Sequence, residues 1–258
     1  MNDRNAARLA GVLFIIATAA SLLGAAVRPS LAGSGYLSVV AADPGRVAAG
    51  SLLLLIAAFA CAGIAVAMYP ILKRAHTGLA LGSVVFRTLE AVMYMVAVVS
   101  LLSISTLGQA SISTGAAGSA SVGVVGGLLL GVREHAALAG VFAFCLGAFL
   151  YYVALLQSRL IPGWLSGWGI AAIVLLATAC VLALFADRPV TSYVLMALPI
   201  FLQEMVLAVW LIAKGFAPAR ASAPEVGRVA PRATGLTAVA PEADSLASRA
   251  AGAPVAAR

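Results

Sequence analysis

The chain has 258 residues, of which 63% are hydrophobic and only 10% are charged, and its mean hydropathy is +1.07. Soluble proteins carry about 25% charged residues, so this chain has too few charges to cover a water-facing surface. The net charge of +7 comes from basic residues scattered singly through the sequence, without a basic face interleaved with aromatics. We therefore expect membrane lipid as a partner and no nucleic acid.

Six apolar segments are each about as long as the ~20 residues with which a helix crosses a bilayer. Lipid cannot satisfy unpaired backbone groups, and these segments lack the alternation of barrel strands, so we expect them to be helices. The predicted fold class is an all-α membrane protein, a six-transmembrane-helix bundle. The expected spans are residues 9–27, 48–72, 78–104, 135–157, 165–186 and 192–213.

The first apolar segment resembles a secretory signal peptide, because Arg4 and Arg8 precede it. Its apolar run is longer than the usual signal-peptide core of about 7–15 residues. We therefore interpret it as a retained membrane anchor.

The Lys and Arg residues near the span ends are distributed unequally between the two sides, which indicates the orientation. The larger group favours both termini in the cytoplasm. Arg also outnumbers Lys and Ala is abundant, as in GC-rich bacteria, so we expect a bacterial cell membrane. One side holds Arg4, Arg8, Lys73, Arg74, Arg159, Lys214 and Arg220, and the other holds Arg28, Arg46, Arg133 and Arg188.

Two long loops are expected on the outer side, at residues 28–47 and 106–134. The second is rich in Ser, Gly and Ala, and its apolar part at 122–132 is too short to span, so we expect that part to lie on the membrane or to enter it slightly. Residues 216–258 consist mainly of Ala, Pro, Arg and Ser. They cannot bury enough apolar surface to fold, which predicts a disordered cytoplasmic tail after a membrane domain at 1–215.

Charged residues inside the expected spans are the most informative feature of the sequence. Arg87 and Glu90 are three residues apart and share one helix face with Ser83 and Tyr94. At 1.5 Å per residue, Arg87 lies about 13 Å and Glu90 about 18 Å from the cytoplasmic side.

In the sixth span, Glu204 follows Gln203 and lies about 15 Å from the same side. Each charge at this depth costs about 2.5–3.5 kcal/mol and should find a partner. We predict that Arg87 pairs with Glu204 across the two spans, with Glu90 as the weaker second partner, since a carboxylate from another helix can engage the guanidinium bidentately.

One Arg cannot neutralise two carboxylates, so either one glutamate is protonated or water reaches it. The structural interpretation is a buried ion pair that fixes helix register. The functional interpretation is a site for a proton, an ion or a small ligand, which is the default for charges inside a membrane. We favour the functional interpretation.

Glu134 and His135, at the outer end of the fourth span, are further candidates for a ligand or a proton relay, although a single histidine there is more often interfacial. The sequence contains no metal-ligand spacing, nucleotide fingerprint or catalytic motif. We therefore expect no cofactor, no metal and no catalytic residue.

Several runs carry a resemblance to a known family. They are SRLIPGWLSGWG at 158–169, GAFLYY at 147–152, ARLAG at 7–11, FRTLEA at 86–91, and Glu204 with WLIAKG at 210–215. Over residues 5–216 the chain resembles the domain-of-unknown-function 4386 (DUF4386) family of bacterial membrane proteins. The resemblance implies a six-helix membrane fold and lends no activity. Many members carry an acidic residue in the second span, which residues 51–68 lack, so no role of that residue is transferred to this chain.

Three functional hypotheses follow. The first is a non-enzymatic membrane protein whose polar core binds a proton or small ligand, in a sensory, regulatory or stress-related role. The second is a small permease, because LEAV at 89–92 and QEMV at 203–206 place a glutamate in the third helix of each half. The third is a lipid-modifying enzyme, which would need a nucleophile or metal site not found here. The sequence does not identify the ligand or the pathway, and it does not decide whether the protein forms a homo-oligomer.

Overall fold

The computed structural model describes residues 2–33, 35–115 and 119–217, which form helices and no strand. Six of these helices are long and apolar enough to cross a membrane, which confirms the predicted fold class. The expected tail lies outside the described residues from residue 218 on. The elements are α1 (Asp3–Val27), α2 (Tyr36–Ala42), α3 (Pro44–Leu72), α4 (Thr77–Ser113), α5 (Ala120–Ser158), α6 (Gly163–Phe185), the 3-10 turn η1 (Val190–Tyr193) and α7 (Val194–Ala213).

Local sequence signals set where several helices begin. The Asn2 side chain accepts a hydrogen bond from the Asn5 backbone N–H at 2.8 Å, and Asp43 accepts one from Arg46 at 3.1 Å. These caps satisfy N–H groups that have no partner within the helix. Pro44 follows Asp43 as the first residue of α3, where its missing N–H costs nothing.

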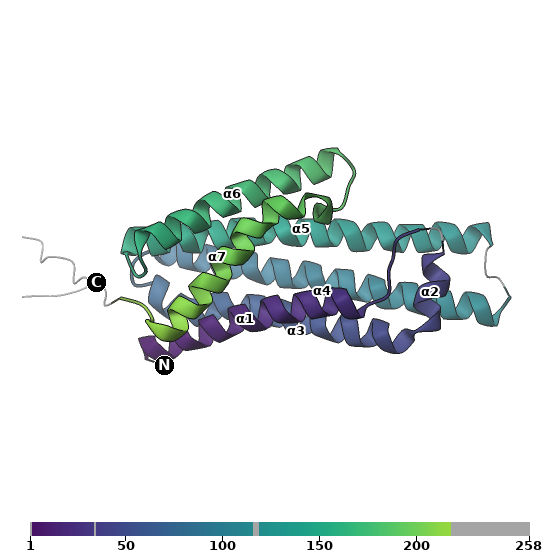
Figure 1. Ribbon diagram of the computed structural model, residues 1–258, viewed down its shortest axis with the longest axis horizontal. Helices are drawn as coiled ribbons and strands as arrows, with labels where there is room; N and C mark the ends of the chain where they lie inside the picture. Colours follow the sequence, from purple (N-terminus) through teal and green to yellow (C-terminus); the bar gives the residue numbers. More distant parts are fainter. Residues whose placement is uncertain (1, 34, 116–118, 218–258) are drawn as a thin grey trace, which may run out of the picture. The chain divides into compact units, whose positions relative to one another are not determined.

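Each of the six long helices contacts the next long helix along the chain, so together they form a ring. In Figure 1 they run lengthwise through the bundle, with α6 and α7 inclined to the others. Contacts between α1 and α7 close the ring, and α3 touches α5 across it. Close approach depends on small residues: a Cβ added at Gly11 of α1 would lie 2.7 Å from the backbone oxygen of Ala208 in α7. Without a hydrophobic force between helices in lipid, such close packing stabilises the bundle.

One end of the bundle, which we call the terminal face, contains Asp3 of α1 and Ala213 of α7. Arg74, in the loop between α3 and α4, binds both carboxylate oxygens of Asp3 at 2.7 and 2.8 Å. Arg4 donates to the backbone oxygens of Ala213 and Lys214 at 2.9 and 2.8 Å. These contacts join α1 to both of its neighbours in the ring.

The expected outer loop at 106–134 was wrong, because α4 and α5 continue through most of it as a helical hairpin. The two helices have 37 and 39 residues, or about 55 and 58 Å, well beyond a hydrocarbon core of about 30 Å. The expected loop at 28–47 likewise contains α2 and the start of α3.

Small residues in the hairpin make room for α2 rather than forming a loop. A Cβ at Gly108 would lie 2.7 Å from the backbone oxygen of Leu37, and one at Gly126 would lie 2.6 Å from the Tyr36 hydroxyl. About two turns before Gly108 along α4, the Ser100 hydroxyl donates to the backbone oxygen of Leu129 in α5 at 2.5 Å. The same glycines that suggested a loop therefore permit tight packing.

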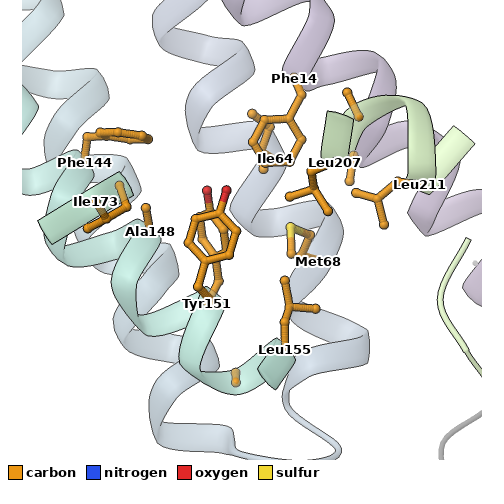
Figure 2. Close-up of a cluster of buried hydrophobic side chains, with 14 of the residues drawn as sticks. Phe14, Ile64, Met68, Phe144, Ala148, Tyr151, Leu155, Ile173, Leu207 and Leu211 are labelled. Atoms are coloured by element: carbon orange, nitrogen blue, oxygen red, sulfur yellow. The ribbon is translucent and has the colours of Figure 1, made fainter. Parts of the chain in front are cut away.

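The main core lies toward the terminal face, where side chains of five helices surround the ring of Tyr151 (Figure 2). Tyr151 and Tyr152 are both fully buried, with ring centroids 4.4 Å apart. Phe14 of α1 meets the Tyr151 ring edge-on, at a centroid distance of 6.4 Å. Two tyrosine hydroxyls are thus carried into an apolar interior, where each needs a hydrogen-bond partner.

Candidate functional site

The only ion pair between buried side chains in the described part of the chain joins Arg87 and Glu90 of α4. Their exposed fractions are 1% and 2%, and Nη1 of Arg87 lies 2.9 Å from Oε2 of Glu90. The N–H is not aligned for a hydrogen bond, so the contact is electrostatic. A partner three residues along the same helix cannot reach the guanidinium end-on, which explains this geometry.

Two other helices complete the surroundings of Arg87. Its Nε donates to the backbone oxygen of Cys61 in α3 at 3.4 Å, and its guanidinium carbon lies 4.8 Å from the ring centre of Phe144 in α5. A Cβ at Gly147 of α5 would lie 3.0 Å from the Arg87 side chain. The cation is therefore held by a carboxylate, a carbonyl and an aromatic face.

A second polar chain joins α5, α7 and α6. The Tyr152 hydroxyl donates a short hydrogen bond to Oε1 of Gln203, and Nε2 of Gln203 donates to the backbone oxygen of Leu165 at 3.1 Å. Gln203 has no exposed surface. Its amide therefore uses one acceptor and one donor to connect three helices.

Glu204 is bound by a hydroxyl rather than by a cation. The Tyr151 hydroxyl donates to Oε1 of Glu204 at 3.2 Å. Among the residues that the structure describes, no Lys, Arg or His lies within ion-pair distance of this carboxyl group. Glu204 is also only partly buried.

The predicted pairing of Arg87 with Glu204 was therefore wrong, since Arg87 pairs with Glu90. The reason lies in the ring: α4 and α7 are opposite members, and tyrosines of α5 bind the polar side chains of α7. Glu90 is already held beside Arg87 by their shared helix, so no helix has to approach.

We use the name polar layer for the ion pair on α4 together with the two tyrosine hydrogen bonds between α5 and α7, which comprise Arg87, Glu90, Tyr151, Tyr152, Gln203 and Glu204. Arg87 lies about 15 Å along α4 from the terminal face, and Glu204 lies about 15 Å along α7 from the same face. The layer thus crosses the bundle at one depth.

The remaining sequence candidates lie outside this layer. Tyr94 packs over Gly140 of α5, where an added Cβ would meet its ring at 3.0 Å. Glu134 is exposed, and Nδ1 of His135 lies 2.7 Å from the backbone oxygen of Gly131 in its own helix. His135 is separated from Tyr151 by about 24 Å of α5, so the structure does not bring the two groups together.

Sequence reasoning missed Tyr151, Tyr152 and Phe144 as members or neighbours of the layer. The available signal was a pair of adjacent tyrosines in the middle of an expected span, where each hydroxyl must find a partner. The Cys61 carbonyl carries no such signal, because a backbone oxygen is the same at every position.

The polar layer combines a neutral ion pair with a separate carboxyl group held by a tyrosine. This arrangement can accept or release a proton at Glu204 without disturbing the pair on α4. Within the described ranges, no three His, Cys, Asp or Glu side chains are grouped as a metal site would require.

Comparison with known proteins places the chain in a family. No match is found among curated proteins or among solved structures. The model of a family described as "Domain of unknown function (DUF4386)" matches residues 9–215, which include all six long helices almost completely and the whole polar layer. With helices of this length and hydropathy, the protein is a multi-pass membrane protein, and the chain belongs to the DUF4386 family.

Proposed function

We propose that this protein is a non-enzymatic membrane protein that takes up a proton or a small polar ligand at Glu204, in a sensory, regulatory or stress-related role. One observation carries the proposal: Glu204 is a carboxyl group at mid-membrane depth whose described partner is a hydroxyl rather than a cation. Intramembrane ionisable residues are expensive to insert and mark functional sites by default.

Electrostatics favours Glu204 over Glu90 as the exchanging group. Arg87 and Glu90 neutralise one another. Uptake of a proton by Glu90 would leave the buried Arg87 charge uncompensated. Glu204 has no such constraint. It is also the one member of the polar layer that is only partly buried by the surrounding helices.

We further propose that the protein resides in the cell membrane with its terminal face, and hence both ends of the membrane domain, in the cytoplasm. The support is the excess of Lys and Arg at this face, including Arg4, Arg8, Lys73, Arg74 and Lys214.

Infrared difference spectroscopy on the purified protein in lipid nanodiscs tests the proton site directly. A protonated carboxyl group has a carbonyl stretch that a carboxylate lacks. We expect the wild type to show such a band that titrates with pH, and Glu204→Gln to lose it. Tyr151→Phe should keep the band and move it to higher frequency, because the carbonyl loses its hydrogen-bond donor.

Glu134→Gln is the matched control, because it also removes one carboxyl group but at an exposed position outside the polar layer. Its spectrum should keep the titrating band. If the band survives in Glu204→Gln and disappears in Glu90→Gln, the exchanging group is Glu90 and the proposal is wrong. Proton flux through proteoliposomes that depends on Glu204 would instead indicate a permease.

A further inference from the structure

A chamber of about 930 Å³ lies at the terminal face, where the end of α5, the start of α6 and the end of α7 meet. Its wall is fixed by backbone contacts: the N–H of Ala217, beyond α7, donates to the backbone oxygen of Leu160 at 2.8 Å. Ligand sites of proteins have volumes of about 300–1,000 Å³. The chamber is therefore large enough for the polar part of an amphiphile.

The charge in this chamber is entirely positive. Arg159 and Lys214 both line it, and no acidic residue does. Both residues are exposed, and within the described residues neither side chain forms an ion pair. Trp210 of α7 also lines the chamber, and it lines a second hollow that runs along the same helix.

An apolar groove continues from the chamber along α7. It has a volume of about 410 Å³ and is lined by Met205, Val206, Val209, Trp210, Ala213 and Lys214. Trp210 and Lys214 belong to both hollows. Met205 lies about 13 Å along the helix from Lys214, so the groove leads from the interface into the hydrocarbon region.

We propose that the chamber and groove together bind one anionic phospholipid, with its phosphate on Arg159 and Lys214 and an acyl chain along α7. A cationic chamber joined to an apolar groove matches a charged headgroup joined to a hydrocarbon chain. Basic pockets between membrane helices are known to hold anionic headgroups. Arg159 adds planar donors suited to phosphate oxygens.

The chain's own C-terminal segment is a poorer occupant. Residues 218–258 contain five Arg against three acidic residues, which gives them a net positive charge. Such a segment would be repelled by Arg159 and Lys214. The polar layer plays no part in this inference, so the lipid site and the proton site can fail independently.

Native mass spectrometry of the full chain, released from detergent with added lipid, measures this binding. We expect phosphatidylglycerol to be retained in preference to phosphatidylcholine with the same acyl chains. The double variant Arg159→Gln/Lys214→Gln should bind phosphatidylglycerol at least about ten-fold more weakly, since it loses two charge-assisted contacts. Lys214→Arg should retain the lipid.

Two further variants separate a specific site from general surface charge. Arg8→Gln removes one charge from the same face without touching the chamber, and its binding should match the wild type. Val209→Trp fills the groove without changing charge, and its lipid retention should fall. This variant keeps the test decisive if the double variant does not fold.

Three results would overturn the proposal. Equal retention of phosphatidylcholine would show that the phosphate charge is not recognised. An equal loss in Arg8→Gln would reduce the effect to surface charge. Displacement of the lipid by glycerol phosphate at the same concentration would show a site for a soluble phosphate, because the apolar groove would then contribute nothing.

Discussion

Replacing the two members of the α4 ion pair, singly and together, gives a direct measure of what holds the polar layer. Glu90→Gln keeps the shape of the side chain but removes the carboxylate that neutralises Arg87. The guanidinium then has only the Cys61 carbonyl, at 3.4 Å from Nε, and the Phe144 ring, whose centre is 4.8 Å from its central carbon. Arg87→Met keeps most of the side-chain stem but leaves the Glu90 carboxylate without a cation. Each single variant therefore buries an unpaired charge, and the double variant buries none.

The expected magnitude follows from the burial of both side chains, which expose only 1% and 2% of their surfaces. Removing one partner of a buried pair costs about 3–5 kcal/mol. Arg87→Met also loses its contact with Phe144, worth about 0.5–2 kcal/mol, so we expect it to be the worse of the two. The double variant should recover about 2–3 kcal/mol relative to the sum of the single losses.

Reversible unfolding in mixed micelles, monitored by tryptophan fluorescence, supplies the four free energies of this cycle. A second cycle with Arg87→Met and Glu204→Gln is the matched comparison, because Glu204 lies at the same depth but is bound by Tyr151. Its losses should add within about 0.5 kcal/mol. A larger coupling in the second cycle than in the first would mean that Arg87 pairs with Glu204 after all.

Two shorter predictions concern packing and topology. Gly169→Ala should destabilise the protein by about 1–3 kcal/mol, because its Cβ would lie 2.5 Å from the Tyr152 ring, which Gln203 holds in place. Gly167→Ala in the same helix, with no atom within 4 Å of the added Cβ, should be tolerated in the same unfolding assay. Reporter fusions after Arg74 and after Arg159 should read cytoplasmic and one at Ser119 external, and an external signal after Arg159 would contradict the proposed orientation.

The sequence predicts the spans well because hydropathy is a property of each segment alone. The depths of Arg87, Glu90 and Glu204 also follow from the fixed rise of a helix. The pairing of these three residues cannot be derived in this way, because it depends on which helices are neighbours in the ring. The hairpin of α4 and α5 was missed for a different reason: Gly and Ser are typical both of loops and of tightly packed helices, and only the position of α2 distinguishes the two.

The proposed uptake at Glu204 requires that its charged and neutral forms have similar free energies, and the contacts around it are consistent with this. An ionised carboxyl group at mid-membrane depth costs about 2.5–3.5 kcal/mol. A hydrogen bond from a hydroxyl to a charged group returns about 1.5–3 kcal/mol, and Tyr151 supplies one such bond. The two terms nearly cancel. At Glu90 the adjacent Arg87 opposes the cost of burial, and its own charge would be left uncompensated if Glu90 took up a proton. Two glutamates at one depth therefore differ in what they can do because one is next to a cation and the other is next to a tyrosine.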